Sequence, residues 1–308
     1  MTYASGGSIQ ATDLNGFVST NSPNFNNIWS TGSTNSGYGQ TAISTVTSGG
    51  IVSASPWASL INEIAASANH QGTTITSITA VSAGDDIDYL AALSTNLTSI
   101  NTNRLNATAV GTDISTTGTR TANWGTAVSI PTVTSTITIT FASANQARYF
   151  FNAGGTIRVG CSRSGGAGNP QDLAWTALCT AVGTLALPAS NSAQTIAGTS
   201  YLGNTKIGGS GTPTVYLRNG FYNLTTTETT YFTQFSTTGV YTGDNLSMTY
   251  KFVTNVLTIS IVFTDVASGT ATDLVTGSLS VTATARQPST TYLSNTWGTP
   301  TVAVTAPA

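Results

Sequence analysis

The sequence predicts a mainly β protein with a helical N-terminal segment, and three patterns along the chain support this fold class. Residues 246–252, 257–263 and 279–285 alternate apolar and polar side chains, which is typical of antiparallel strands with one solvated face. Two segments, residues 55–70 and about 86–104, instead carry apolar side chains at helical spacing. The first 50 residues show neither period. We therefore expect an antiparallel β-sandwich-like body that carries two short helices, preceded by an extended arm and a helical hairpin.

Residues 1–50 are expected to form an extended docking arm. They are rich in Ser, Asn and Gly, which favour turns, yet they contain isolated aromatic residues that a disordered tail usually lacks. Trp29 and Tyr38, together with Trp57 beyond the arm, are therefore candidate docking anchors. Two alternatives stay open from the sequence, because these anchors can pack on the chain's own helices or on a partner.

Residues 51–107 are expected to form a helical hairpin or a short coiled coil. Ser55-Pro56 supplies a helix start, Gly72 supplies a stop, and a second helix is predicted over about 86–104. Four apolar residues of this second helix follow the a/d spacing of a coiled coil and are the predicted self-association surface. A compatible alternative is an antiparallel hairpin in which the first helix covers this stripe. The four residues are Leu90, Leu93, Leu97 and Ile100.

A Thr/Gly-rich run over 108–122 is expected to be a linker, and a β-rich body is expected over 123–308. β-Branched residues over 132–141 predict a strand. Two short helices are expected within the body: Ser143 caps the first, and Asn169-Pro170 starts the second. Glycine follows each of these helices as a stop signal.

The composition excludes several classes of function. Charged residues make up 6% of the 308 residues, against about 25% in an average soluble domain. Nine Lys+Arg are too few for the basic stripe that nucleic-acid binding requires. No run of about 18 apolar residues predicts a membrane span. The first residues lack the features of a secretory signal, so we expect synthesis in the cytoplasm. This composition favours a structural or binding protein.

No cofactor and no metal site are predicted. Cys161, Cys179 and His70 lack the spacing of zinc ligands, so the cysteines are expected to stay reduced. The histidine is expected to act as a local cap or surface contact. The Gly-rich runs at 165–168 and 208–211 lack the Lys-Ser/Thr of a phosphate-binding loop. Three acidic residues near the second helix are expected to cap it rather than to bind Ca²⁺. They are Asp85, Asp86 and Asp88.

Catalytic groups are scarce in this sequence. Only His70 is present to act as the base of a Ser-His-Asp triad, and no triad is predicted. Asp265 and Asp273 flank a Ser/Gly/Thr loop and are the best carboxylate pair for a glycan-cleaving site. Their separation in space would decide the class of reaction. We expect the protein not to be an enzyme.

Four segments carry a resemblance to a known group of proteins. They are NIWSTGSTNSGYGQT, SPWASLINEI with the NHQG that ends the same helix, INTNRLNA and FASANQARYFFNAGGTIRV. Over residues of about 20 to 160 the chain resembles virion structural proteins of tailed bacteriophages, in particular tail, neck or fibre-type proteins of marine and cyanobacterial phages. The resemblance implies a non-enzymatic component of the virion that contacts other virion proteins. It also implies cyclic self-association, as a trimer or hexamer. It transfers no active-site residues.

Other functions stay open on the sequence alone. Within the virion, a head decoration protein is the main structural alternative. A receptor- or glycan-binding module that uses exposed Tyr and Trp residues of the C-terminal loops is the second alternative. A hydrolase of envelope glycans that uses Asp265 and Asp273 is the least favoured.

Overall fold

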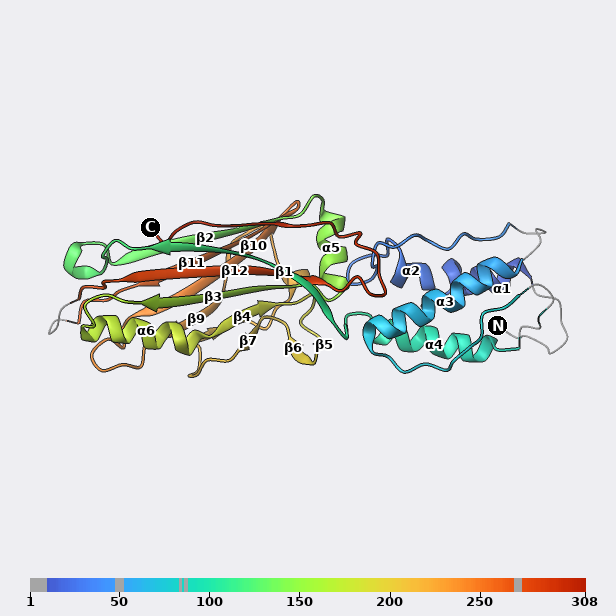
Figure 1. The fold of residues 1–308 in the computed structure, drawn as a ribbon, viewed down its shortest axis with the longest axis horizontal. Helices are drawn as coiled ribbons and strands as arrows, with labels where there is room; N and C mark the ends of the chain where they lie inside the picture. The colour runs from blue at the N-terminus through green and yellow to red at the C-terminus, as the bar shows by residue number, and fades with distance from the viewer. Residues whose placement is uncertain (1–9, 48–52, 83–84, 86–87, 269–272) are drawn as a thin grey trace.

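Two parts of the chain lie one after the other along the long axis of the molecule (Figure 1). Helices from the first hundred residues form one end, and β-strands form an elongated body that extends to the other end. The fold is mainly β, with 32% strand and 26% helix, and the predicted fold class is confirmed. The structure, a computed structural model, describes residues 10–47, 53–82, 85, 88–268 and 273–308.

The described residues of the helical part form five helical segments. The longest, α3, ends at Gly72, whose φ of 70° lies in the left-handed region that glycine tolerates best. The five segments are α1 (Ala11–Asn15), the π-helical turn η1 (Gly16–Thr20), α2 (Phe25–Trp29), α3 (Ala54–Gln71) and α4 (Leu90–Thr102).

The prediction of an extended arm is wrong for residues 11–29, which form α1, η1 and α2. Burial of aromatic side chains explains this, since Phe25 is fully buried against the rest of the helical part. The Asn26 side chain then ties α2 to the extended stretch that follows. Its Nδ2 donates to the Ile43 oxygen, its Oδ1 accepts from the Ile43 nitrogen, and both distances are 2.9 Å. The arm therefore folds back on the chain's own helices.

Helices α3 and α4 run parallel, so the predicted antiparallel hairpin is wrong. The Tyr38 hydroxyl meets the C-terminal ends of both helices: it accepts from Gln71 Nε2 and donates to the Arg104 oxygen, each at 2.7 Å. The chain between the helices returns alongside them. Asn96 of α4 exchanges two hydrogen bonds, of 2.9 and 2.8 Å, with the backbone of Thr76. This return is what allows two consecutive helices to point the same way.

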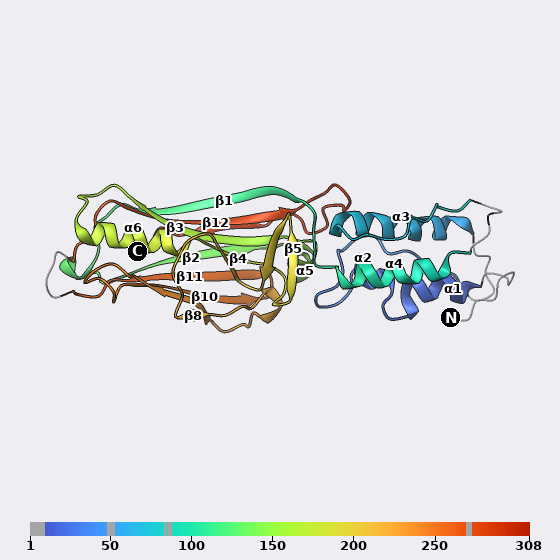
Figure 2. The ribbon, with the colours of Figure 1, turned by 90° about the horizontal axis from the view of Figure 1, so that it is seen from below.

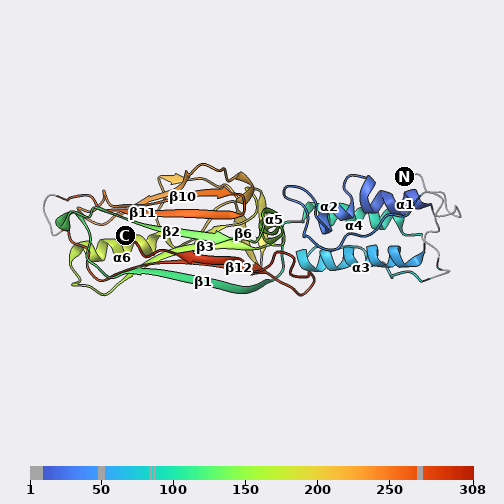
Figure 3. The ribbon, with the colours of Figure 1, turned by 90° about the horizontal axis from the view of Figure 1, so that it is seen from above.

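Two antiparallel sheets face each other in the β body (Figures 2 and 3). The five-stranded sheet has the order β1-β12-β3-β4-β7 and the six-stranded sheet the order β13-β2-β11-β10-β9-β8, while β5 pairs only with β6. In chain order the strands are β1 (Val110–Arg120), β2 (Thr132–Thr140), β3 (Thr156–Ser164), β4 (Thr184–Leu187), β5 (Ala193–Ile196), β6 (Thr199–Leu202), β7 (Thr205–Ile207), β8 (Val215–Tyr216), β9 (Thr229–Phe235), β10 (Asn245–Val253), β11 (Val256–Thr264), β12 (Ser278–Pro288) and β13 (Thr301–Val304).

The alternation in the sequence corresponds to the two faces of these sheets. On β11 the side chains of Leu257, Ile259 and Ile261 are fully buried between the sheets, and the residues between them are half-buried. The predicted hairpin of β10 and β11 is confirmed. Its turn places Thr254 at a φ of 58°. The core is therefore the apolar interior of a sandwich, as the period of two predicts.

The predicted linker over 108–122 is wrong, because most of it is the edge strand β1, paired with β12. The Thr-rich composition of β1 is typical of a loop, but the hydroxyl groups of every second residue face hydroxyl groups on the neighbouring strand β12. Thr117 Oγ1 lies 2.8 Å from Thr282 Oγ1, and Thr119 Oγ1 lies 2.8 Å from Ser280 Oγ. Such cross-strand pairs stabilise a sheet without apolar residues on that face. The helical part therefore continues into the body without a spacer.

The two predicted short helices of the body are confirmed as α5 (Ala144–Asn152) and α6 (Pro170–Val182). Ser143 Oγ accepts from the Gln146 nitrogen at 3.1 Å, as the predicted N-cap requires. Asn169 Oδ1 accepts from the Asp172 nitrogen at 2.8 Å. Helix α5 lies where the body meets the helical part, and α6 lies along the body (Figure 1). Two 3₁₀ turns complete the description: η2 (Thr126–Val128) and η3 (Phe221–Asn223).

Candidate functional site

The predicted self-association stripe is covered by the chain itself. Its side chains contribute to the apolar interior of the helical part, and α4 packs beside α3. The prediction of a self-association surface is therefore wrong for this stripe, because the intramolecular contact with α3 already removes these side chains from water. The exposed fractions are 9% for Leu90, 0% for Leu93, 3% for Leu97 and 0% for Ile100.

The three predicted docking anchors also pack within the chain. Trp29, Tyr38 and Trp57 are 7%, 1% and 1% exposed. Trp29 stacks on Phe25, with ring centroids 5.5 Å apart, and Phe17 and Trp57 pack in a T-shaped arrangement, with ring centroids 6.0 Å apart. Of the two alternatives that the sequence leaves open, the structure has the intramolecular one. These three side chains hold the helical part together and are not themselves exposed to a partner.

Tyr38 and His70 join the helical part to the body. The main-chain carbonyl oxygen of Tyr38 accepts a hydrogen bond from Thr296 Oγ1 at 2.7 Å. His70 Nε2 lies 3.1 Å from the Ala153 oxygen, to which it donates as the neutral ring. The prediction of a surface histidine is wrong: the side chain is 1% exposed, and burial lowers its pKa to about 4. We call this contact region, with α5 at its centre, the junction.

Backbone groups are held closely across the junction. Asn152 Nδ2 donates to the Gly37 oxygen at 3.0 Å, and Gln40 Oε1 accepts from the Ser294 nitrogen at 2.9 Å. Gly39 has a φ of 75°, and a Cβ there would lie 2.4 Å from the Tyr149 ring. Only glycine fits at this approach. The junction is therefore a specific interface between the two parts of the chain.

The end of the body opposite the junction consists of strand connections, and we call it the distal loop end. It comprises residues 121–131, 165–169, 236–244, 265–268 and 273–277. Ten large apolar side chains are exposed among the described residues. Six of these lie on the distal loop end or on α6 and β9, which lead into it. Their exposed fractions are 41% for Val128, 38% for Ile130, 60% for Leu173, 38% for Phe235, 55% for Val240 and 45% for Val266.

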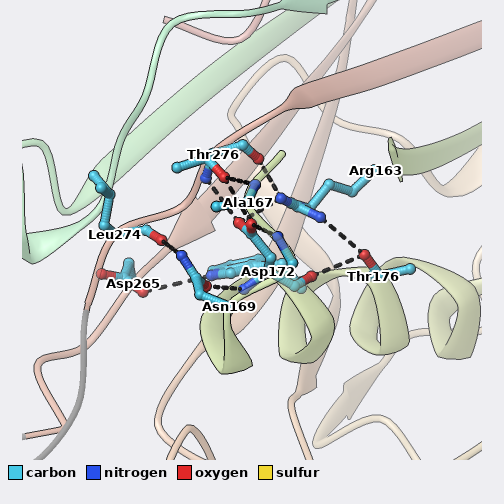
Figure 4. A network of polar contacts seen from close by, with 10 residues as sticks. Arg163, Ala167, Asn169, Asp172, Thr176, Asp265, Leu274 and Thr276 are labelled. Carbon is cyan, nitrogen blue, oxygen red and sulfur yellow. Dashed lines mark hydrogen bonds and ion pairs between the residues drawn. The ribbon is translucent and has the colours of Figure 1, made fainter. Parts of the chain in front are cut away.

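A buried network of polar contacts lies beneath these loops (Figure 4). Its centre is Asp172, in the first turn of α6, which forms an ion pair with Arg163 of β3. The Asp172 carboxylate also accepts from the Gly168 nitrogen at 3.0 Å and from the nitrogen and hydroxyl of Thr276 at 2.8 and 2.6 Å. This one carboxylate therefore fixes a strand, a helix and two connections relative to one another.

Two more buried carboxylates meet at Gln171. Its Nε2 donates to Asp244 Oδ2 at 2.8 Å and to Asp265 Oδ1. Asp244 Oδ1 accepts from the Val266 nitrogen at 2.9 Å, and Asp265 Oδ2 accepts from the Thr126 nitrogen at 2.7 Å. Burial raises the pKa of Asp244 to about 7 and also raises the pKa of Asp265. These groups fix three connections of the distal loop end to α6.

The predicted pair Asp265 and Asp273 serves local structure. Asp265 is 2% exposed, so a glycan has no direct access to its carboxylate. Asp273 accepts from the nitrogen and hydroxyl of Ser268, at 3.1 and 2.9 Å, within its own connection. The acids that the sequence analysis missed as partners are Asp172 and Asp244. The signal available was Arg163, a charged residue within the predicted strand that begins at Thr156, which calls for a partner if it is buried.

The acidic residues before α4 do not cap it, and this prediction is wrong where the structure describes them. Helix α4 starts after Tyr89, and Asp85 Oδ2 instead accepts from the Ser82 nitrogen at 2.7 Å. Asp88 precedes the helix without a described capping bond, and Asp86 lies outside the described residues. Within the described ranges, no three His, Cys, Asp or Glu side chains are grouped as metal ligands.

None of the helices in the described part of the chain is long and apolar enough to cross a membrane. No protein-family model matches the sequence, and neither a curated protein nor a solved structure is significantly similar to it.

Proposed function

We propose that this chain is a non-enzymatic structural protein of a tailed-phage virion, a tail, neck or fibre-type component. The helical part docks on the particle, and the distal loop end contacts a second virion protein or the host surface. The observation that carries this proposal is the concentration of exposed apolar side chains at one end of an elongated molecule. Exposed apolar side chains gathered at one end are typical of protein contact surfaces.

The internal use of charged groups supports a structural function. In the body, Asp172, Asp244 and Asp265 are each at most 2% exposed and bond to neighbouring loops or side chains. Carboxylates in such surroundings stabilise connections and are poorly placed to meet a substrate. The resemblance over residues of about 20 to 160 covers most of the helical part together with β1, β2 and α5, and it is the basis on which we assign docking to the helical end.

Self-association as a trimer or hexamer remains part of this proposal. The stripe around Leu93 is occupied within the chain, so other surfaces must hold the subunits together. The distal loop end carries the exposed apolar residues such a contact needs, and Val240 and Val266 are the best exposed of its loop residues. We therefore assign contacts between subunits or with other virion proteins to this end.

Immunolabelling of purified phage particles tests the proposal. An antibody against this chain should label the tail or neck in negative-stain electron micrographs, and mass spectrometry should detect the chain in the washed particles. Labels on the head would make it a decoration protein instead. The proposal fails if the chain is abundant in infected cells but absent from purified particles.

A pair of variants tests the distal loop end itself. The double variant Val240→Asp, Val266→Asp changes two exposed side chains there, and Val253→Asp changes a side chain of similar exposure, 42%, at the opposite end of β10. Both should fold, because surface substitutions usually change stability by about 0.5 kcal/mol or less. Only the double variant should lose assembly into particles or self-association. Equal behaviour of the two variants would remove this end from the proposal.

A further inference from the structure

The chain's two cysteines lie at one place in the fold. Cys161 is on β3 and Cys179 is on α6, which packs along that strand. Both are free thiols, and both line the same open hollow of about 320 Å³. They are separated in the sequence by the whole connection of residues 165–169 and most of α6. The tertiary fold therefore creates this dithiol.

The hollow exists because β3 changes its neighbour at this point. Strand β4 pairs with β3 only as far as Gly160, which faces Thr184. Beyond that residue α6 lies beside β3. Cys161 is half-buried, whereas Cys179 is 2% exposed behind it. A reagent in the hollow therefore reaches Cys161 first.

The neighbouring Cys179 also affects the protonation of Cys161. The neighbouring Cys179 thiol and burial raise the pKa of the Cys161 thiol above its ordinary value. Since the thiolate is the nucleophile in disulfide exchange, reaction at neutral pH is slow and accelerates as the pH rises. An intramolecular disulfide needs two thiols that lie close together, and these two line one hollow between β3 and α6.

We propose that Cys161 and Cys179 form a reversible disulfide between β3 and α6 when the protein meets a small disulfide such as oxidised glutathione. The Cys161 thiolate attacks one sulfur of the small disulfide, which gives a mixed disulfide and releases one small thiolate. The Cys179 thiolate then attacks the Cys161 sulfur and releases the second small thiolate. The two protons lost by the protein are taken up by the two released thiolates.

This disulfide would bind α6 covalently to the strand that it packs on. Gln171 and Asp172, which hold the connections of the distal loop end, both belong to α6. A cross-link lowers the conformational entropy of the unfolded state. The oxidised protein should therefore unfold at a higher temperature than the reduced protein. The modification therefore stabilises the distal loop end and does not depend on the proposed function.

Thiol counting and intact mass test the proposal on the full chain. The folded protein is incubated with oxidised glutathione at mildly alkaline pH. The wild type should lose both free thiols, lose two hydrogen atoms in mass without a glutathione adduct, stay a single chain on a non-reducing gel, and recover both thiols with dithiothreitol. Cys179→Ser should instead accumulate a glutathione adduct on Cys161, and Cys161→Ser should stay largely unreacted because Cys179 is buried.

The opposite results are equally clear. A stable glutathione adduct on the wild type, or disulfide-linked dimers, would show that the second thiol does not reach the first. Unchanged thiols in the folded chain, with ready oxidation of the same chain in denaturant, would show that the fold holds the two sulfurs apart. A thermal midpoint that does not rise on oxidation would contradict the stabilisation of α6.

Discussion

Arg163 and Asp172 form a buried ion pair that joins β3 to the first turn of α6, with side chains 3% and 0% exposed. The pair is further bonded, since Arg163 Nη1 donates to Thr176 Oγ1 at 3.2 Å and Thr276 donates twice to Asp172. A buried pair of this kind adds little if compared with an apolar replacement, but the loss of one partner leaves an uncompensated charge.

Asp172→Ala should therefore lower the free energy of unfolding by about 3–5 kcal/mol, because the Arg163 charge then stays buried alone. Denaturant unfolding followed by circular dichroism measures this loss. The matched control is Asp113→Ala, which breaks the exposed pair of Asp113 with Arg286 and should cost less than about 1 kcal/mol. Similar losses in the two variants would mean that the buried pair has no special role.

His70 makes stability depend on acidity at the junction. Burial lowers its pKa to about 4, below the ordinary value of 6.5, so between these values the unfolded chain binds a proton that the folded chain does not. The histidine's contribution is therefore lost as the pH falls from about 6.5 to 4, by up to about 3 kcal/mol. His70→Gln should remove this part of the pH profile, as measured by unfolding at several pH values. If the free energy of unfolding of the variant depends on pH as steeply as that of the wild type, a group other than His70 causes the dependence.

Asp244 should act in the opposite direction. Its pKa is raised to about 7 from 3.8, so the folded chain holds a proton that the unfolded chain releases. This contribution to stability is complete below about pH 4 and is lost as the pH rises through 7. Asp244→Asn should unfold with less dependence on pH between 5 and 8 than the wild type. Glu63→Gln is a useful comparison, because burial also raises the pKa of Glu63 to about 7, on the helical part.

Leu93 distinguishes core packing from self-association. It is fully buried in the helical part, so Leu93→Ala should lower the free energy of unfolding by about 2–5 kcal/mol. The molar mass from light scattering should match that of the wild type, whatever that mass is, under conditions where the variant stays folded. A smaller molar mass than that of the wild type, with an unchanged free energy of unfolding, would mean that Leu93 lies in a contact between subunits.

Where the apolar residues are periodic, their period was sufficient to predict the type of element. Alternation predicted β10 and β11, and cap residues predicted the starts of α5 and α6. These signals are local, and so they survive without knowledge of the tertiary fold. No local signal of this kind predicts the direction of α4 relative to α3. This direction depends on a return segment that is held by Asn96 and Thr76, two polar residues without any periodic pattern.

The candidate site was less predictable than the fold. Strand β1 lacks apolar alternation because its partners are hydroxyls on β12, a relation that spans more than 160 residues. Asp172 was recognisable as a first-turn residue of a helix, but its pairing with Arg163 depends on how α6 packs on β3. Likewise, the stripe around Leu93 has the same sequence pattern whether a second chain or α3 covers it.

The long strands of the body run nearly along the long axis of the molecule (Figure 1). Tension between the two ends would therefore act on the ladder between β1 and β12 in shear, so that many hydrogen bonds must break together rather than one after another. The same direction of pull reaches the helical part through the Asn152–Gly37 and Gln40–Ser294 contacts. In this geometry a pull along the long axis loads many hydrogen bonds at once, a property that the proposed function at a contact between large particles would use.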